Sequence, residues 1–386
     1  MKPVRAAAAE AFREIFGREA TALARAPGRV EFIGNHTDYN GGSVLGAAID
    51  RHVTVAAARS EQRRLRLFTK DGPAVLELPS DQATRVTGSD AWANYPLGVW
   101  RALADFQLPR PEGFDLYVSA NLPSGAGLSS SAALELAVAL VLLKIAGRDR
   151  IDPATLAQVG RHAENHYVGV PCGILDQGTI AHARAGQLVR IDCQGPVFSL
   201  VPFPEQAALW VFNTREKHAL VDGLYAERHR ECQQAAQLLG VNWLCDLRPA
   251  ERPVWEAQLP ALLARRVRHV VDENDRVRRV SDALGAGNLA ETGRILVESH
   301  RSSQHNFENS TPALDALVDQ LANERGVYGA RLTGGGFGGA VVALAAPEFT
   351  RQAAQRIGER HAQVHGLQPE ILELHAADGA ALLELG

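Results

Sequence analysis

Pro123-Ser-Gly-Ala-Gly-Leu-Ser-Ser-Ser-Ala-Ala133 is a turn-rich stretch between a strand-like run and a long apolar run that is typical of a helix. Gly125 and Gly127 let the backbone approach a ligand because they carry no Cβ. The serines stand where the helix is expected to begin, near Leu128. A helix N-terminus has unpaired N–H groups and a partial positive charge, so it binds phosphate without a lysine. The stretch favours a phosphate-binding loop, with a simple serine cap as the alternative.

Lysine is rare in this chain of 386 residues. Only four of the 40 basic residues are lysines, and none of the four follows a glycine. This excludes a Walker A phosphate loop, in which a lysine must follow the last glycine. The 44 acidic residues give a net charge of −4, which argues against a general nucleic-acid binder. The lysines are Lys2, Lys70, Lys144 and Lys217.

The length and a change in composition near residues 195–215 predict two domains, one over 1–205 and one over 206–386. Strand and helix patterns alternate in the first half, whereas helical patterns dominate the second, so the fold class is α+β. Strands are expected at residues 51–58, 64–69, 74–78, 114–120, 187–192, 208–213, 340–345 and 370–375. Helices are expected at residues 5–17, 91–106, 153–167, 223–239, 267–284, 289–299 and 312–324, besides the one that starts near residue 128.

The chain shows no signature of export or of a membrane span. The longest apolar run is too short to cross a bilayer, and the alanines before Glu10 are too few for a signal core. The four cysteines have no CxxC spacing, which argues against a disulfide framework and a zinc knuckle. We therefore expect a cytoplasmic protein.

A second glycine-rich segment, Gly334-Gly-Gly-Phe-Gly-Gly-Ala-Val341, matches GxGxxG and even the kinase pattern GxGxxGxV. A strand-like run follows it, whereas a dinucleotide-binding loop opens a helix. The sequence also lacks the lysine and the HRD and DFG motifs of protein kinases. We expect this segment to pack against a ligand or another loop.

Two carboxylates are candidates for chemistry. Asp176 lies just after a glycine-containing turn, where a carboxylate is a candidate base or metal ligand and a helix cap is the alternative. Glu164 lies between His162 and His166, which are spaced like zinc ligands. Ala163 stands where a zincin has glutamate, so zinc is disfavoured.

A polar cluster lies near the N-terminus. Arg29, His36, Asp38 and Asn40 are crowded into what reads as a short loop between apolar runs. A buried sugar hydroxyl needs a hydrogen-bond partner, so such a cluster suits a polyhydroxylated ligand. A hydrogen-bonded surface turn is the alternative.

Taken in chain order, the segments 26–42, 125–132 and 332–339 resemble the three motifs of the GHMP small-molecule kinases, and more narrowly those of the galactokinase family. Weaker similarities lie between them, so the resemblance spans nearly the whole chain. It implies an N-terminal domain like ribosomal protein S5 domain 2, a ferredoxin-like C-terminal domain and an active site between the two. It also implies ATP and Mg²⁺ as cofactors and a monosaccharide as substrate.

The resemblance implies a role for each matching residue. Asp176 would be the general base for the anomeric hydroxyl, with Arg29 beside it to stabilise charge. Ser131 and Glu164 would hold Mg²⁺. The ATP phosphates would bind to Gly125, Ala126, Gly127, Leu128, Ser129, Ser130 and Ser131. The sugar site would be lined by Asn35, His36, Asp38, Gly173, Asp176 and Tyr225.

Two departures from the family pattern bear on the sugar. The family has glutamate where Asn35 stands and asparagine where Glu31 stands, so the two residue types are exchanged across four positions. In galactokinases that glutamate contacts sugar hydroxyls. We hypothesise that Glu31 and Asn35 hydrogen-bond to each other and that Asn35 meets the sugar more weakly. Gln304-His-Asn-Phe307 also departs from the usual Arg-Asp-Asp-Tyr and is expected to border the same pocket.

The expected function is ATP-dependent phosphorylation of a monosaccharide at its C1 hydroxyl by direct in-line transfer, with galactose as the leading substrate. A GHMP kinase for a 6-deoxy or N-acetyl hexose is one alternative. A non-catalytic sugar sensor is another, although the known sensors lose a Ser-Ala pair that is present here as Ser131-Ala132. The sequence predicts no nucleic-acid or membrane partner.

Overall fold

The structure is a computed structural model that describes residues 4–70, 72, 74–122, 127–170, 172–216 and 221–385. Its strands form one sheet of eight strands and one of four. The larger sheet contains β1 (Ala22–Ile33), β2 (Ser43–Arg59), β3 (Arg64–Thr69), β4 (Leu76–Pro79), β5 (Phe114–Ala120), β6 (Gln187–Asp192), β7 (Val197–Pro202) and β12 (Ala381–Leu383). The smaller sheet contains β8 (Ala208–Asn213), β9 (Val327–Thr333), β10 (Ala340–Ala345) and β11 (Glu370–Leu374).

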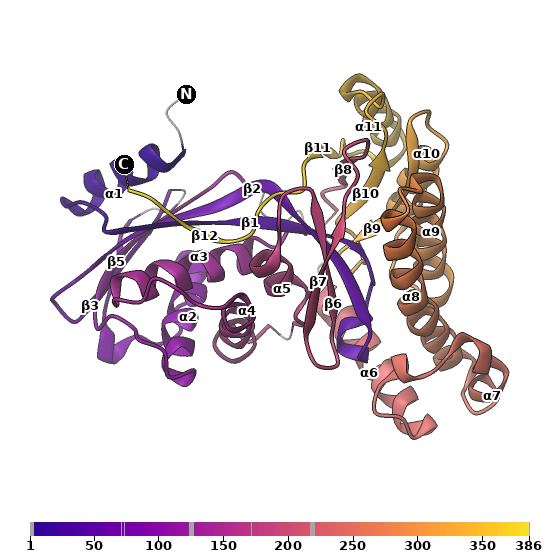
Figure 1. Ribbon diagram of the computed structural model, residues 1–386, viewed down its shortest axis with the longest axis horizontal. Coiled ribbons are helices and arrows are strands. Elements are labelled where there is room, and N and C mark those ends of the chain that lie inside the picture. The colour runs from indigo at the N-terminus through magenta and orange to yellow at the C-terminus, as the bar shows by residue number, and fades with distance from the viewer. Residues whose placement is uncertain are drawn as a thin grey trace.

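The helices fall into two groups. Those beside the larger sheet are α1 (Val4–Phe16), α2 (Asn94–Asp105), α3 (Ser130–Ile145), α4 (Pro153–His162) and α5 (Leu175–His182). Those of the second half are α6 (Val221–Leu239), α7 (Arg252–Glu256), α8 (Ala261–Gly285), α9 (Leu289–Ser302), α10 (Pro312–Ala322) and α11 (Arg351–His365). In Figure 1, α2 to α5 lie below the larger sheet and α1 above it, while α8, α9 and α10 stand together at the other end of the molecule.

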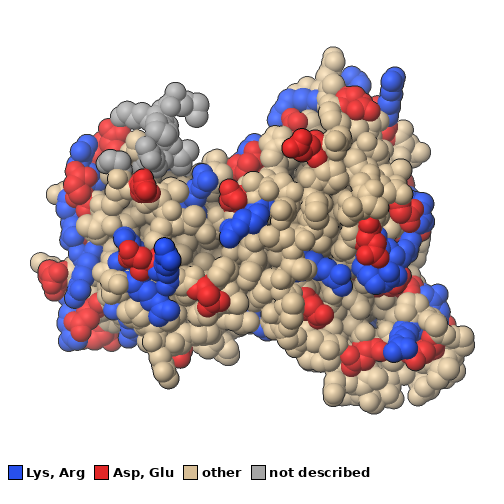
Figure 2. Space-filling view, viewed as in Figure 1, with Lys and Arg blue, Asp and Glu red and all other residues tan. Residues whose placement is uncertain are grey.

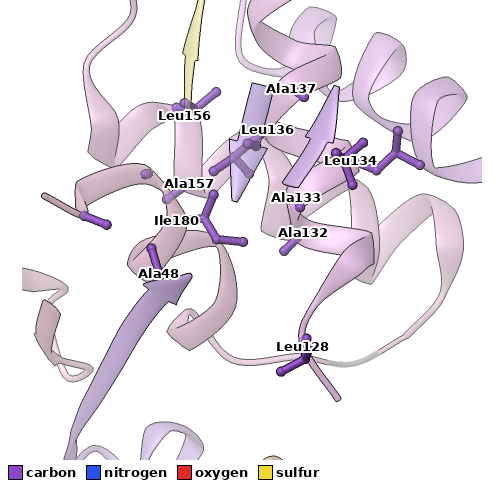
Figure 3. Packing of buried hydrophobic residues seen from close by; sticks show 14 of the residues in the cluster. Ala48, Leu128, Ala132, Ala133, Leu134, Leu136, Ala137, Leu156, Ala157 and Ile180 are labelled. Carbon is purple, nitrogen blue, oxygen red and sulfur yellow. The ribbon is translucent and has the colours of Figure 1, made fainter. Parts of the chain in front are cut away.

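The larger sheet holds α3 in place, the helix that follows the glycine-serine loop (residues 123–131). The sheet follows the order β12-β1-β2-β5-β3-β4, and α3 packs on β1 and β2. Every residue from Ala132 to Leu143 of α3 is buried, as expected for a helix that is apolar on all sides. Figure 3 shows part of this core, with Ala132, Ala133 and Leu136 near Ile180 of α5. The start of α3 is therefore anchored beside β1 and α5.

The smaller sheet has the topology that the sequence predicted for the C-terminal domain. Its order is β11-β8-β10-β9 and each neighbouring pair is antiparallel. Numbered along the chain this is 4-1-3-2, the order of a ferredoxin-like sheet. One face is covered by α10 and α11 and the other by α9.

Most predicted elements are present, but four strands were not predicted, namely β1, β7, β9 and β12. The strands expected at 64–69, 114–120, 187–192, 208–213 and 340–345 have those bounds. The residues around Arg29 were expected in a loop, and this was wrong because β1 runs from Ala22 to Ile33. Pro27 and Gly28 lie inside β1, where such residues usually mark a bulge, and the pairing with β2 shifts register there. Arg29 is therefore held rigidly on a strand.

The end of the chain returns to the first sheet, because β12 pairs with β1. The domain boundary near residue 205 stays a prediction. All four cysteines are free thiols, as their spacing suggested. Among the described helices, none has the length and apolar character needed to span a membrane. Figure 2 shows acidic and basic side chains interspersed over the face in view.

Candidate active site

An ion pair between Arg29 of β1 and Asp176 of α5 lies at the centre of the candidate site. Nε and Nη2 of Arg29 each lie 2.6 Å from Oδ1 of Asp176. Nη1 of Arg29 donates to the carbonyl oxygen of Gly127 at 2.7 Å. Arg29 is only 7% exposed, so these partners fix the plane of its guanidinium. The two residues predicted as catalytic are in direct contact, and both reach the glycine-serine loop.

Glycine at position 28 allows β1 to approach this loop. A Cβ on Gly28 would lie 2.6 Å from the carbonyl oxygen of Leu128, which is closer than carbon and oxygen can approach. The amide of Arg29 donates to the same oxygen at 3.0 Å. The strand that carries Arg29 and the loop expected to bind phosphate are thus locked together through backbone atoms.

Ser129 connects the loop to Asp176. Its backbone is left-handed, with φ of 56°, and its hydroxyl donates to Oδ2 of Asp176. Within the described residues its side chain makes no capping bond to α3, so the simple cap that we weighed as an alternative is wrong for this serine. The first N–H groups of α3 face the loop without that cap and can receive a phosphate. Gly125 and Ala126 lie outside the described residues.

Two further carboxylates converge on Gln177, the residue after Asp176. Nε2 of Gln177 donates to Oε2 of Glu164 at 2.7 Å and to Oε2 of Glu135 at 3.0 Å. Burial raises the pKa of Glu135 well above its ordinary value, and the charge of Glu164 adds to this shift. Burial likewise raises the pKa of Glu164, and the charge of Asp176 adds to it. The site therefore carries crowded acidic groups, of which only Asp176 is paired with Arg29.

The donors at this position fit a magnesium ion. Ser131 follows Ser130 in the first turn of α3 and lies close enough to Glu164 for its hydroxyl to favour the ionised form and lower the pKa of that carboxyl, against the larger effect of burial. Mg²⁺ prefers oxygen ligands and usually takes one or two carboxylates, with water and phosphate oxygens completing its shell. Oε1 of Glu135 is buried and has no hydrogen-bond partner among the described residues. No group of three or more His, Cys, Asp or Glu side chains in the described chain is arranged to hold a metal by itself, so phosphate oxygens would have to contribute.

Several of the predicted sugar-binding residues lie close to one another, and the charge of Asp176 acts on two of them, Asp38 and Tyr225. A Cβ on Gly173 would lie 1.8 Å from Oδ2 of Asp38, so only glycine permits this approach. The ring of Tyr225 lies 4.9 Å from the ring of His36, centroid to centroid. Burial raises the pKa of Asp38 to about 6, and the negative charge of Asp176 adds to this shift. Asp38 and Asp176 are thus close enough to interact electrostatically.

His36 is a neutral side chain with a defined tautomer. Its Nε2 lies 2.9 Å from the carbonyl oxygen of Gly335, so this nitrogen carries the proton and donates. Its Nδ1 accepts from the hydroxyl of Tyr39 at 2.9 Å. Burial lowers the pKa of His36 to about 3, which keeps the ring uncharged. Its backbone is left-handed, with φ of 61°, which is uncommon for a residue other than glycine.

The exchanged pair Glu31 and Asn35 is hydrogen-bonded, which confirms that part of our hypothesis. Nδ2 of Asn35 donates to Oε1 of Glu31 at 3.1 Å and to the carbonyl of Gly334 at 2.7 Å. Oδ1 of Asn35 accepts from Nδ2 of Asn309 at 2.7 Å. The same Oε1 of Glu31 lies 3.1 Å from Nη1 of Arg331. Asn35 is 1% exposed, so a sugar hydroxyl would have to compete with these protein partners.

The second glycine-rich segment, residues 334–341, packs against the first motif, residues 26–42. The carbonyls of Gly334 and Gly335 accept from the side chains of Asn35 and His36. The expectation that this segment packs against another loop is therefore confirmed. Phe307 borders the same region, because its ring lies 4.5 Å from the ring of His36.

Three residues of the site were not predicted. Glu135 is a single acidic residue inside an otherwise apolar helix, which was an unused signal in the sequence. Gln177 directly follows Asp176, and its amide is what brings the two buried carboxylates together. Arg331 is a fully buried charge in β9 whose partner, Glu31, lies 300 positions away in the sequence. For Glu135 and Arg331, the available signal in the sequence was a charged residue inside an apolar helix or strand.

Comparisons with known proteins agree with this geometry. The galactokinase galactose-binding signature matches residues 10–59, and the GHMP kinase N-terminal and C-terminal domains match residues 94–184 and 280–363. The crystal structure of Lactococcus lactis galactokinase complexed with galactose is 31% identical to this chain, with a TM-score of 0.94. That match covers 99% of this chain and 100% of the other. The chain belongs to the galactokinase family.

Membership of the galactokinase family makes the chain a sugar kinase and confirms the predicted two-domain GHMP kinase fold. More distant kinases share the fold alone. Methanococcus jannaschii mevalonate kinase is 18% identical, with a TM-score of 0.66 over 92% of this chain and 98% of the other. The L. major mevalonate kinase in complex with R-mevalonate is also 18% identical, with a TM-score of 0.64 over 93% and 96%. In this galactokinase-family chain the galactose-binding signature spans Arg29, Asn35, His36 and Asp38.

Proposed function

We propose that the chain transfers the γ-phosphoryl group of ATP to the C1 hydroxyl of galactose. The observation that carries this proposal is the position of the Arg29–Asp176 pair. The pair contacts Gly127 and Ser129 of the glycine-serine loop, and Asp176 is also close enough to Asp38 for its charge to raise the pKa of Asp38. A base and a cation between a phosphate loop and a polar pocket are the parts that in-line phosphoryl transfer needs. Galactose is the sugar bound in the L. lactis galactokinase structure.

Each residue then has a role in the reaction. Asp176 accepts the proton of the C1 hydroxyl as its oxygen attacks the γ-phosphorus, and the bond to the leaving ADP oxygen breaks in line. Arg29 stabilises the charge on the transferring group, since a guanidinium stays ionised and has fixed N–H directions. Residues 125–131 cradle the phosphates with backbone N–H groups and serine hydroxyls. His36, Asp38, Gly173 and Tyr225 line the sugar site. Asn35 borders the sugar site and contacts the sugar more weakly than these four residues do.

Ser131 and Glu164 would hold Mg²⁺ at this site. When bound, the ion would neutralise phosphate charge and orient the β- and γ-phosphates. The sensor alternative is disfavoured because the base, the serines and the acidic metal ligand are all assembled. We expect the reaction in the cytoplasm, a location that four free thiols support.

A kinase for another hexose is the second candidate, and the buried amide of Asn35 favours it. Initial rates with ATP should be measured for galactose, 6-deoxygalactose, N-acetylgalactosamine and glucose. We expect kcat/KM for galactose to exceed that for each other sugar by at least about tenfold, since a site that hydrogen-bonds a hydroxyl rejects analogues in which that hydroxyl is missing, replaced or oriented differently. Turnover of another sugar with little turnover of galactose would replace the proposed substrate. Sugar binding without turnover of any sugar would favour the sensor.

The reaction should lose efficiency in acid because of Asp38. Its pKa of about 6 means that the side chain accepts hydrogen bonds from sugar hydroxyls above pH 6 and carries its own proton below it. We expect kcat/KM for the sugar to fall about tenfold per pH unit below pH 6. The measurement is a profile of kcat/KM from pH 5 to 8. In Asp38→Asn we expect a lower kcat/KM at neutral pH and no change of slope near pH 6. If the change of slope persists in this variant, another group is responsible for it.

Glu164→Gln should weaken the magnesium dependence. The substitution keeps the shape but removes the ionised oxygens that a hard cation prefers. We expect the Mg²⁺ concentration for half-maximal activity to rise about tenfold or more at fixed ATP. Glu112→Gln is the matched control, because Glu112 is an exposed carboxylate paired with Arg63 and has no place in the proposed metal site. Equal magnesium requirements in wild type and Glu164→Gln would remove Glu164 from the proposed metal site.

A further inference from the structure

Helix α8 contacts the loop that carries His36 and Asp38, two of the proposed sugar-binding residues. This loop connects β1 to β2 and is defined as residues 34–43, of which Ser43 is also the first residue of β2, whereas α8 belongs to the second half of the chain. His269 and Glu273 are four residues apart on α8, so they lie on one face of the helix, and Asn274 directly follows Glu273. Each of the three hydrogen-bonds to a backbone group of the loop.

Glu273 holds the start of the loop. Its Oε1 accepts from the amides of Gly34 and Asn35, each at 3.2 Å, and from the hydroxyl of Ser299 at 2.7 Å. Its Oε2 accepts from Nε of Arg276 at 2.7 Å. Although burial opposes ionisation, Arg276 and the more distant Arg331 hold the pKa of Glu273 below its usual range. An ionised, fully buried acceptor therefore faces two consecutive N–H groups.

His269 and Asn274 hold two more backbone groups. Nε2 of His269 lies 3.1 Å from the carbonyl of Asn35, and its Nδ1 accepts from the hydroxyl of Ser302 at 3.0 Å. Burial lowers the pKa of His269 to about 4, so the neutral ring donates through Nε2. Oδ1 of Asn274 accepts from the amide of Ser43 at 2.8 Å, at the other end of the loop.

These contacts fix the part of the backbone that orients the ligands. His36 has φ of 61°, a conformation that is sparsely populated for residues other than glycine, and Gly34 has φ of 111°, which its lack of a Cβ permits. Such a backbone persists only where its surroundings impose it. The side chains of His36 and Asp38 leave the loop within two and four residues of Gly34. Their positions therefore depend on the peptide planes that α8 holds.

We propose that His269, Glu273 and Asn274 form a clamp of positioning residues that sets the conformation of the sugar-binding loop from the C-terminal half of the chain. The clamp rests on the proposed function for the identity of the ligand. Its hydrogen bonds are observed independently of any substrate. The clamp predicts that sugar affinity depends on α8, whereas ATP affinity does not, since the phosphate loop is held by β1, α3 and α5.

Asn274 offers a matched pair of variants. Asn274→Asp keeps an oxygen that accepts from the Ser43 amide, and Asn274→Leu has nearly the same shape without an acceptor. We expect hydrogen exchange at the Ser43 amide to speed up about tenfold or more in Asn274→Leu and to stay near the wild-type rate in Asn274→Asp. Exchange is measured on the full chain without substrate, so its result does not depend on which sugar is phosphorylated.

Steady-state kinetics supply the second readout. For the sugar that wild type phosphorylates best, we expect KM to rise about tenfold in Asn274→Leu and further in Glu273→Gln, with KM for ATP within about twofold. Asn274→Asp should restore a near-wild-type sugar KM. Asp282→Asn, an exposed carboxylate on the same helix, is the control and should change neither value.

Two results would overturn the clamp. One is an equal Ser43 exchange rate in wild type, Asn274→Leu and Asn274→Asp. The other is faster exchange in Asn274→Leu with an unchanged sugar KM, which would show that the contact does not position the loop for binding. Failure of wild type to phosphorylate galactose would instead refute the proposed substrate, and the exchange comparison would still decide whether the contact orders the loop.

Discussion

Replacing Asp176 by asparagine is expected to lower kcat by about 10²–10⁴-fold, the range that a general base contributes. The side-chain amide of this variant would keep its oxygen toward Arg29, and its NH2 group would donate to the Ser129 hydroxyl in place of the bond that Oδ2 of Asp176 accepts, so the local geometry should survive. An amide has no basic oxygen that can take the proton of the C1 hydroxyl. The sugar should therefore still bind while transfer nearly stops. Coupled detection of ADP gives kcat, and calorimetric titration with galactose gives the affinity.

The control for this variant is Asp192→Asn, an exposed carboxylate at the end of β6. It carries the same change of charge away from the site and should behave like wild type. Undiminished turnover in Asp176→Asn would show that another group takes the proton. Loss of galactose binding together with turnover would show that Asp176 serves mainly to hold the sugar.

The sequence was sufficient to find the residues that stand beside turns. Asp176 and Ser129 each lie next to glycine-containing segments, where a backbone can approach a ligand, and both prove to contact Arg29 or each other. The interpretation of Arg29 as a loop residue failed because Pro27 and Gly28 are turn formers in isolation. The long antiparallel pairing of β1 with β2 outweighs that local preference.

Contacts between distant parts of the chain were beyond reach of the sequence pattern. Glu273 reads as one more charged residue on a polar helix, and nothing local shows that it is fully buried against the amides of Gly34 and Asn35. The exchange of Glu31 and Asn35 did suggest their hydrogen bond, because four residues separate them. The ion pair of Glu31 with Arg331 came only from the fold, which brings β9 against β1.

Arg29→Lys is expected to lower kcat by about 10³-fold or more, as for other arginines that stabilise a transferring phosphoryl group. The positive charge is retained, so a site that needed charge alone would remain active. Arg29, however, uses Nε and Nη2 for Asp176 and Nη1 for the carbonyl of Gly127, three N–H directions in one plane. A lysine ammonium is a shorter, single point of charge and cannot hold both partners at once. Asp176 and the loop at Gly127 would then no longer be held by the same side chain.

The matched control is Arg25→Lys, an exposed arginine on the same strand, which should leave kcat unchanged. Single-turnover measurements at saturating ATP and sugar separate the transfer step from product release, and the loss should appear in the transfer step. Galactose affinity should change far less than kcat, because His36 and Asp38 are held by other elements. Near-wild-type transfer in Arg29→Lys would mean that charge, and not the planar fork, is what the reaction uses. A loss confined to galactose affinity would instead move Arg29 from the reacting centre to the sugar pocket.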